Sequence, residues 1–245
     1  TIFLLIIAGY FSSSAYAASN EDVLLKRANE LYKEGDIEEA ITNYEKIIEL
    51  NPTNYEVLCF LCVGYDKTKQ STKALETCSR AINIIPDRPE AYLNLGMVYR
   101  NLGQRESEIS NFEKAIKHSK SPEIYTKAYA NLGFTFVSLG QYNNAQMNFK
   151  KAIEYDPKNY EAHYWLGFCY YKSGDLETAR KYYEKSLEIN PDYGAPYIGL
   201  GLIYQQLGDF RKAKENYQIE ANLLRKEGKE LEAKELESLI DKEFP

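Results

Sequence analysis

The chain of 245 residues is 44% hydrophobic and 27% charged, a composition that supports a buried core and excludes a disordered or collagen-like chain. Its 36 acidic residues outnumber its 30 basic residues, which gives a net charge of -6 at pH 7. Because this charge repels phosphate groups and no basic patch stands out, we expect neither a nucleic acid partner nor binding of the folded body to an anionic membrane surface.

Residues 1–20 begin with an apolar run, continue with small residues and contain Ala15-Tyr16-Ala17, an A-x-A sequence that signal peptidase accepts. The apolar run ends near Phe11, short of the roughly 20 residues that span a bilayer. The segment predicts a signal peptide and an exported protein of the periplasm, the cell envelope or the extracellular space. The alternative is an N-terminal anchor, and in either case membrane contact is restricted to this segment.

Glycine and proline recur at a fixed interval along residues 21–227. The residues that keep an interval of 34 are Pro52 and Pro86, Pro157 and Pro191, and the glycines Gly140, Gly174 and Gly208. Apolar residues return every three or four positions between them, so each unit is predicted to be a helix, a tight turn and a second helix. The glycine suits a left-handed turn, and the proline stops the second helix. The predicted units are 21–54, 55–88, 89–125, 126–159, 160–193 and 194–227.

Small and large residues interlock between the two helices of each unit. Small residues fall where the helices must approach closely, at Ala28, Cys62, Gly96, Gly133, Gly167 and Gly201 on the first helices and at alanines on the second. Large residues fill the gaps beside them, with Tyr65, Tyr99, Phe136, Tyr170 and Tyr204 set against Tyr44, Phe112, Phe149, Tyr183 and Tyr217. With segments such as Tyr164-Trp165-Leu166-Gly167, the chain resembles the tetratricopeptide-repeat family, whose 34-residue pattern combines an aromatic residue, Leu-Gly, Tyr, Ala, a second aromatic residue and Pro. The resemblance implies an all-α, right-handed superhelical solenoid of helix-turn-helix repeats. Apolar residues at helical spacing in residues 228–245 predict a C-terminal capping helix.

The third unit departs most from this pattern. It is three residues longer than the others and carries Glu108 where the other units have alanine. We expect the helices around Glu108 to splay apart and a loop from His118 to Pro122 to protrude, with His118 exposed. In the second unit, Lys69 takes the place of the turn glycine.

The sequence offers little to catalysis or metal binding. Two histidines are too few for most metal or acid-base sites, and no nucleophile elbow or phosphate-binding glycine loop occurs. His163 occupies a position that holds tyrosine in other units and is interpreted as a packed structural residue. We therefore expect no catalytic residue, no metal, no cofactor and no small-molecule substrate.

Three of the four cysteines lie in the second unit. Cys59 and Cys62 have the CxxC spacing of thiol-redox proteins, but they lie inside a helix and lack the βαβ context of that motif. Cys62 and Cys78 fall on inward faces of one hairpin, and export would expose them to an oxidising compartment. We predict a disulfide between Cys62 and Cys78, which requires their Cα atoms to lie within roughly 7 Å.

In the family that this chain resembles, the first helix of each unit lines a concave face that binds ligands. The corresponding positions predict a peptide-binding groove formed by Leu93, Met97, Phe134, Val137, Tyr164, Phe168, Tyr171 and Leu202. An apolar, aromatic groove of this kind suits an extended or helical peptide. The alternative is that these side chains only pack between neighbouring first helices.

Together these features predict a monomeric, non-enzymatic scaffold or adaptor of the cell envelope that binds a protein or peptide in its groove. One alternative function is a structural component that assembles with itself or with an envelope complex through its outer faces. The other is a thiol-redox factor that uses Cys59 and Cys62.

Overall fold

A computed structural model describes residues 20–243, which form helices joined by short turns and contain no strand. The chain divides at residue 120 into two compact units. The predicted signal segment lies outside the described residues except for its last residue, Asn20. Among the helices that are described, none is long and apolar enough to cross a membrane.

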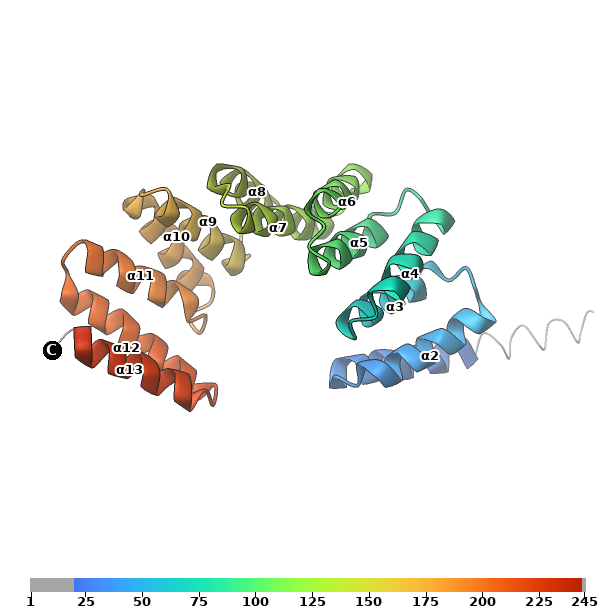
Figure 1. The fold of residues 1–245 in the computed structure, drawn as a ribbon, viewed down its shortest axis with the longest axis horizontal. Helices are drawn as coiled ribbons and strands as arrows, with labels where there is room; N and C mark the ends of the chain where they lie inside the picture. The colour runs from blue at the N-terminus through green and yellow to red at the C-terminus, as the bar shows by residue number, and fades with distance from the viewer. Residues whose placement is uncertain (1–19, 244–245) are drawn as a thin grey trace, which may run out of the picture. The chain divides into compact units, whose positions relative to one another are not determined.

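The first unit stacks three helical hairpins (Figure 1). The pairs are helical residues 20–34 with α2 (Ile37–Leu50), α3 (Tyr55–Lys67) with α4 (Ser71–Ile84), and α5 (Pro89–Asn101) with α6 (Arg105–His118). Each hairpin packs on the next, since α3 contacts α2 and α5 as well as its partner α4. The core of this unit is therefore continuous from one hairpin to the next.

The second unit repeats the arrangement and adds a last helix. Its pairs are α7 (Pro122–Ser138) with α8 (Tyr142–Tyr155), α9 (Tyr160–Lys172) with α10 (Leu176–Ile189), and α11 (Ala195–Gln206) with α12 (Phe210–Lys226). Helix α13 (Glu230–Glu243) packs against α12 in the position expected of a cap. It buries Ala233 and Ile240, while Leu231 and Leu239 remain exposed. The chain is thus an all-α helical-repeat solenoid, as the sequence predicts.

The tight turns inside the hairpins follow the residues that predict them. Gly174, between α9 and α10, has a φ of 84°, and Lys69 takes the same left-handed conformation at 59° in place of glycine. After the turn, the carboxylate of Asp175 accepts a hydrogen bond of 3.0 Å from the backbone N–H of Thr178 and caps α10. Asp209 caps α12 in the same way, whereas Asp36 makes no side-chain cap hydrogen bond to α2. The left-handed turn therefore marks where the second helices begin, and a carboxylate cap is added at α10 and α12.

A ring lies over a glycine inside most hairpins. In the α7–α8 hairpin, a Cβ atom placed on Gly133 would lie 2.7 Å from the ring of Phe149, which is fully buried. The same contact joins Gly96 to Phe112, and Gly167 to Tyr183. Because only glycine leaves room for the ring, this contact sets the distance between the two helices of the hairpin.

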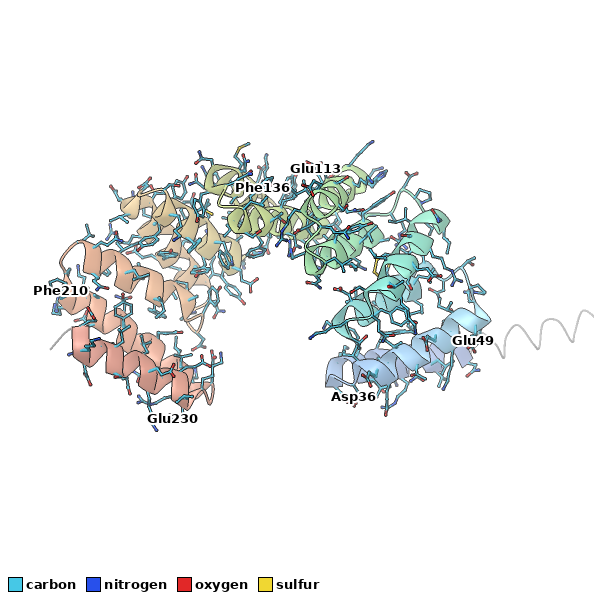
Figure 2. All side chains as sticks on the ribbon, viewed as in Figure 1. Asp36, Glu49, Glu113, Phe136, Phe210 and Glu230 are labelled. Atoms are coloured by element: carbon cyan, nitrogen blue, oxygen red, sulfur yellow. A yellow bond between two sulfur atoms is a disulfide. The ribbon has the colours of Figure 1, made fainter. Side chains whose placement is uncertain are left out.

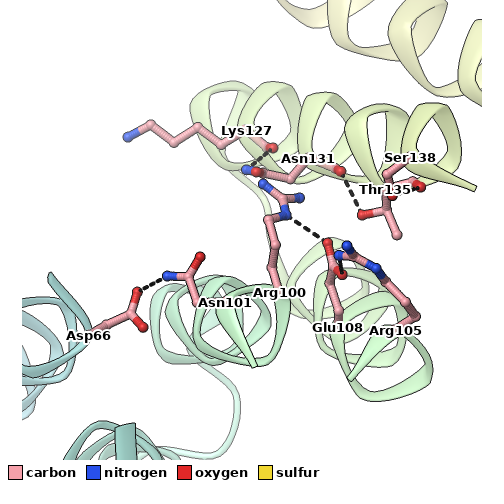
Figure 3. Close-up of polar contacts among 9 residues, drawn as sticks. All are labelled: Asp66, Arg100, Asn101, Arg105, Glu108, Lys127, Asn131, Thr135 and Ser138. Atoms are coloured by element: carbon pink, nitrogen blue, oxygen red, sulfur yellow. Dashed lines mark hydrogen bonds and ion pairs between the residues drawn. The ribbon is translucent and has the colours of Figure 1, made fainter. Parts of the chain in front are cut away.

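Glu108 does not open the third hairpin, so the prediction that its helices splay is wrong. Its carboxylate is fully buried and lies 2.7 Å from both the Arg100 Nε and the Arg105 Nη1 atoms (Figure 3). The Phe112 ring still packs against Gly96, where a Cβ atom would lie 2.6 Å away. Two guanidinium groups thus allow a carboxylate to occupy a position that holds alanine elsewhere.

The predicted protruding loop after the third hairpin is also absent. Helix α7 begins at Pro122, so the three extra residues form an additional helical turn, and the predicted boundary at residue 125 falls inside α7. His118 is half-buried rather than exposed, because its ring stacks on Tyr92 with centroids 5.3 Å apart and its Nδ1 atom lies 3.4 Å from Asp87. Proline is favoured at the first turn of a helix, which accounts for the earlier start of α7.

Candidate functional site

The first helices of the second unit carry a continuous group of aromatic side chains. We define the aromatic face as Phe134 on α7, the residues Tyr164, Trp165, Phe168 and Tyr171 on α9, and Leu202 on α11. On α9 these positions recur at intervals of three and four residues, so they lie along one side of the helix. The face therefore arises from one stripe of α9 and one residue contributed by each neighbouring first helix.

Edge-to-face contacts connect the rings of the aromatic face. The Trp165 ring lies 5.2 Å from that of Phe134, 5.4 Å from that of Phe168 and 5.1 Å from that of Tyr164, measured between centroids. Such pairs contribute about 0.5–1.5 kcal/mol beyond the area that they bury. All four side chains are half-buried, so they pack on one another and still present ring surface to solvent.

Fully buried rings support the aromatic face from behind. Phe149 of α8 lies 5.3 Å from Phe134, and Tyr183 of α10 lies 5.6 Å from Tyr164. Both supporting rings are in turn held against the glycines of the first helices. The exposed rings consequently sit on a close-packed layer that fixes their orientation before any ligand arrives.

The polar groups of the aromatic face are neutral hydroxyl and amide groups. Burial raises the pKa of the Tyr164 hydroxyl above its ordinary value, so it stays protonated at physiological pH. The side chain of Gln206 on α11 donates a hydrogen bond of 2.8 Å to the Tyr171 hydroxyl and ties α11 to α9. The face can therefore offer ring surface and hydrogen bonds to a ligand.

The eight residues predicted to line the groove are divided between the two units. Leu93 and Met97 lie on α5 in the first unit, and the other six lie on α7, α9 and α11 in the second. Leu93 is only 7% exposed, whereas Met97 is 37% exposed. Val137 is half-buried and packs in the same cluster as Phe134.

Trp165 is missing from the prediction although it joins the rings of α7 and α9. It lies directly after Tyr164 and one turn before Phe168, so helical spacing alone would have placed it on the same side. The equivalent position holds a polar residue in the two preceding repeats, Asn94 and Asn131, so the repeat pattern did not indicate an aromatic residue there. Only the structure shows that the tryptophan ring turns toward Phe134.

The cysteine pair of the second hairpin forms a disulfide in the structure. Cys62 of α3 and Cys78 of α4 are linked across the hairpin, with their Cα atoms 5.4 Å apart (Figure 2). Cys59 and Cys169 are free and buried, and burial raises the pKa of each thiol to about 12. A thiol with so high a pKa carries almost no thiolate at neutral pH, which argues against the redox role considered for Cys59 and Cys62.

His163 is a packed structural residue, as its position predicts. It is 6% exposed, its Nε2 atom lies 3.0 Å from the carbonyl oxygen of Pro157, and burial lowers its pKa. Within residues 20–243, no cluster of three or more His, Cys, Asp or Glu side chains could hold a metal ion.

Comparison with known families places repeats along most of the chain. Models described as "Tetratricopeptide repeat" match residues 21–54, 89–120, 160–193 and 182–215, and one described as "TPR repeat" matches residues 133–174. The first and fifth predicted units coincide with two of these matches.

Two curated proteins illustrate the level of sequence similarity. The chain is 34% identical over 76 residues to the BBSome complex member BBS4 homolog of Drosophila melanogaster, a match that covers 31% of this chain and 16% of that protein. It is 30% identical over 97 residues to the Photosystem I assembly protein Ycf3 of Prochlorococcus marinus, with 38% of this chain and 56% of that protein covered. The matches thus span only part of each relative.

Solved structures show the same fold at low sequence identity. The structure of pilF from Pseudomonas aeruginosa has a TM-score of 0.75 at 17% identity and covers 91% of this chain and 98% of its own. PilW, titled a widely conserved type IV pilus biogenesis factor, has a TM-score of 0.72 at 23% identity, covering 84% and 92% of the two chains. YrrB, titled a TPR protein with an unusual peptide-binding site, has a TM-score of 0.57 at 21% identity, covering 78% and 97%. With the repeat interval and the ring-over-glycine hairpins, these findings show that the chain belongs to the tetratricopeptide-repeat family.

Proposed function

We propose that this chain is a non-enzymatic scaffold of the cell envelope that binds a protein or peptide segment on the aromatic face. The observation that carries the proposal is the contact of Trp165 with both Phe134 and Phe168, which joins the first helices of two repeats into one half-buried ring surface. Large aromatic side chains of this kind dominate the binding energy of protein interfaces. A partner segment laid across them buries ring area without reordering the surface.

The packing behind the aromatic face supports binding over a purely structural role. The core position beneath each first helix is already filled, by Phe149 under Phe134 and by Tyr183 under Tyr164. The outer rings are therefore not needed to close the hairpins, and Leu202 remains 38% exposed beside them. A contiguous apolar surface on a folded protein is a candidate interaction site.

The placement in the cell envelope rests on two independent arguments. Residues 1–20 have the pattern of a signal peptide, and a disulfide such as Cys62–Cys78 persists in oxidising compartments. Two proteins with the same fold are pilF and a type IV pilus biogenesis factor, and one partial relative is an assembly protein. A role in assembling a larger complex agrees with the signal-peptide pattern, the disulfide and these similar proteins. We expect the free scaffold to be monomeric.

Affinity capture from an envelope extract tests the proposal. The bait is compared with a Phe168→Glu, Leu202→Glu variant, which puts two carboxylates on the aromatic face without touching the supporting rings. The matched control is Met147→Glu, because Met147 is 67% exposed and lies on α8, a second helix. Circular dichroism must show equal helicity for all three proteins.

A peptide that spans the captured segment then gives the affinity directly. We expect the double variant to bind this peptide at least tenfold more weakly than the unchanged chain, since hot-spot side chains contribute about 2 kcal/mol or more. The Met147→Glu control should change the affinity less than twofold. Equal capture and equal affinity for all three proteins would assign the interaction to the outer faces instead.

A further inference from the structure

The stripe of aromatic residues on α9 lies between two exposed charges of opposite sign. Glu161 precedes Tyr164 by one turn and Lys172 follows Phe168 by one turn, so both lie on the side of α9 that bears the rings. Glu161 and Lys172 are eleven positions apart, which corresponds to about 16 Å along the helix axis at 1.5 Å per residue. The aromatic stripe therefore has an acidic end and a basic end.

Neither charge is neutralised by a neighbour. Within residues 20–243, the structure gives no ion pair or side-chain hydrogen bond for Glu161 or for Lys172. The Lys172 Nζ atom lies 5.7 Å from the centroid of the Phe168 ring, which keeps the ammonium group over the aromatic face. Both groups are thus available to a charged partner.

The neighbouring first helices, α7 and α11, add no unpaired charge beside the rings. On α7, Lys127 forms an ion pair with Glu123 at 2.6 Å, so that pair adds no net charge. The side of α11 next to α9 presents Leu202 and Gln206, which are neutral. Among the charged residues of α7, α9 and α11, Glu161 and Lys172 are therefore the two that no ion pair offsets.

The Lys172 end also opens into a polar recess. Besides Lys172, the recess is lined by Gly140, Gln141, Tyr142, Asn143, Asn144 and Ser173. The Tyr142 ring lies 6.4 Å from Phe168, so the recess adjoins the aromatic stripe. Side-chain amides and an ammonium group together form a surface that suits a carboxylate.

We propose that the aromatic face selects an extended peptide with an apolar core flanked by charges of opposite sign, a basic residue at Glu161 and an acidic residue at Lys172. About five residues of extended chain at 3.3 Å each span the 16 Å between the two charges. The inference rests on the proposed function and names the class of segment bound. The rings supply most of the affinity, because exposed ion pairs contribute only about 0.2–1 kcal/mol each. The charges determine in which direction the peptide lies across the face.

A panel of synthetic peptides tests the inference. Each peptide is blocked at both ends, carries the core Leu-Ala-Phe-Ala-Leu, and differs only in its flanking residues, which are Lys and Glu in either order, two Lys, two Glu or two Gln. Fluorescence anisotropy measures their affinity for the unchanged chain, for Lys172→Glu and for Glu161→Lys. Lys181→Glu serves as the control, since Lys181 is exposed and lies on α10, away from the first helices.

The unchanged chain should bind a mixed-charge peptide roughly threefold to tenfold more tightly than the peptides with two like charges. Lys172→Glu should move the preference to the peptide with two lysines, and Glu161→Lys to the peptide with two glutamates. The Lys181→Glu control should keep the original preference. Raising the ionic strength from about 0.1 M to 1 M should remove most of the discrimination, because the screening length falls from about 10 Å to 3 Å.

Two other outcomes would overturn the inference in distinguishable ways. If all peptides bind equally and Phe168→Glu, Leu202→Glu weakens every one of them, the face binds peptides but does not read their charge, and only the further inference fails. If the peptides bind equally and this double variant binds them as well as the unchanged chain does, the aromatic face is not the site, and the proposed function fails as well.

Discussion

The α3–α4 and α9–α10 hairpins fill the same pair of positions with different chemistry. Cys62 and Cys78 are 16 residues apart and form a disulfide, while Gly167 and Tyr183 keep the same separation and form a ring-over-glycine contact. The Tyr183 ring also lies against Gly199 of the next hairpin, whereas the disulfide joins only the helices of its own hairpin. The repeat therefore fixes the distance between two helices, and either packing or a covalent bond can hold it.

The largest effect should follow from removal of the ring in the α9–α10 hairpin. Tyr183→Ala deletes a side chain that is 1% exposed and that contacts glycines of two helices, so we expect the free energy of unfolding to fall by about 3–5 kcal/mol. Urea denaturation followed by Trp165 fluorescence reports this loss, because the only tryptophan of the chain lies on α9. Tyr182→Ala, which alters a half-buried neighbour on the same helix, should cost clearly less.

A second substitution shows whether the ring and the glycine act as a pair. Gly167→Val alone should destabilise the chain, since a Cβ atom there would lie 2.9 Å from the Tyr183 ring. When Gly167→Val is combined with Tyr183→Ala, the total loss should be at least about 1 kcal/mol smaller than the sum of the two separate losses. Strict additivity would contradict the contact described for this hairpin.

Reduction of the disulfide should have the next largest effect. In the chain-entropy treatment a loop of 16 residues corresponds to about 3 kcal/mol of stabilisation. Circular dichroism follows the helices of both units, whereas Trp165 fluorescence follows the second unit only. Dithiothreitol should therefore lower the urea midpoint measured by circular dichroism more than the midpoint measured by Trp165 fluorescence. Thiol titration of the denatured, unreduced chain should find two free thiols out of four, and a count of four would disprove the bond.

In the third hairpin, a charged residue occupies a position that holds alanine elsewhere, and substitutions can measure how this affects the free energy of unfolding. Arg105→Ala removes one of the guanidinium partners of the fully buried Glu108 and should cost about 1–3 kcal/mol. Glu108→Ala restores the small residue of the other hairpins and frees two arginines that are 27% and 34% exposed, so it should cost less. If Glu108→Ala proves the more damaging change in urea denaturation, the carboxylate contributes more to the hairpin than its ion pairs imply.

The helices and turns could be predicted from the repeat because each depends on residues that are close together in the sequence. A glycine followed by aspartate, as at Gly174 and Asp175, specifies a left-handed residue and a helix cap within two positions, and the structure shows both. The pairing of Cys62 with Cys78 could also be predicted, since their spacing matches that of the small and large residues in the other hairpins. Features that depend on a fixed spacing of a few residues are therefore readable from sequence.

The surface was harder to predict because exposure depends on neighbours that the repeat does not specify. Leu93 and Tyr164 occupy equivalent positions, yet Leu93 is buried and Tyr164 is half-buried. The burial of Glu108 likewise depends on Arg100, which lies on the other helix of the hairpin. Equivalent repeat positions thus share a direction, but their exposure and their partners follow from the side chains around them.

The smallest effect concerns Glu220 of α12, at a position that holds Ala152 and Ser186 in the two preceding repeats. Its Oε2 atom is buried without a hydrogen-bond partner, and a Cβ atom on Gly194 would overlap its carboxylate. Burial raises the pKa of Glu220 above its usual value of 4.5. The folded state consequently holds this proton more tightly than the unfolded state does, so the contribution of Glu220 to stability should increase as the pH falls from 7 toward 4.5.

Replacement of this carboxylate separates its effect from those of the other acids. Glu220→Gln should make the chain slightly more stable than the unchanged protein at pH 7, and the difference should shrink as the pH approaches 4.5, because the protonated acid and the amide are both uncharged. Thermal unfolding at a series of pH values measures the difference, with Glu215→Gln as a matched control, because Glu215 is an exposed acid on the same helix. A constant difference at all pH values would mean that shape rather than charge distinguishes Glu220 from the smaller residues of the preceding hairpins.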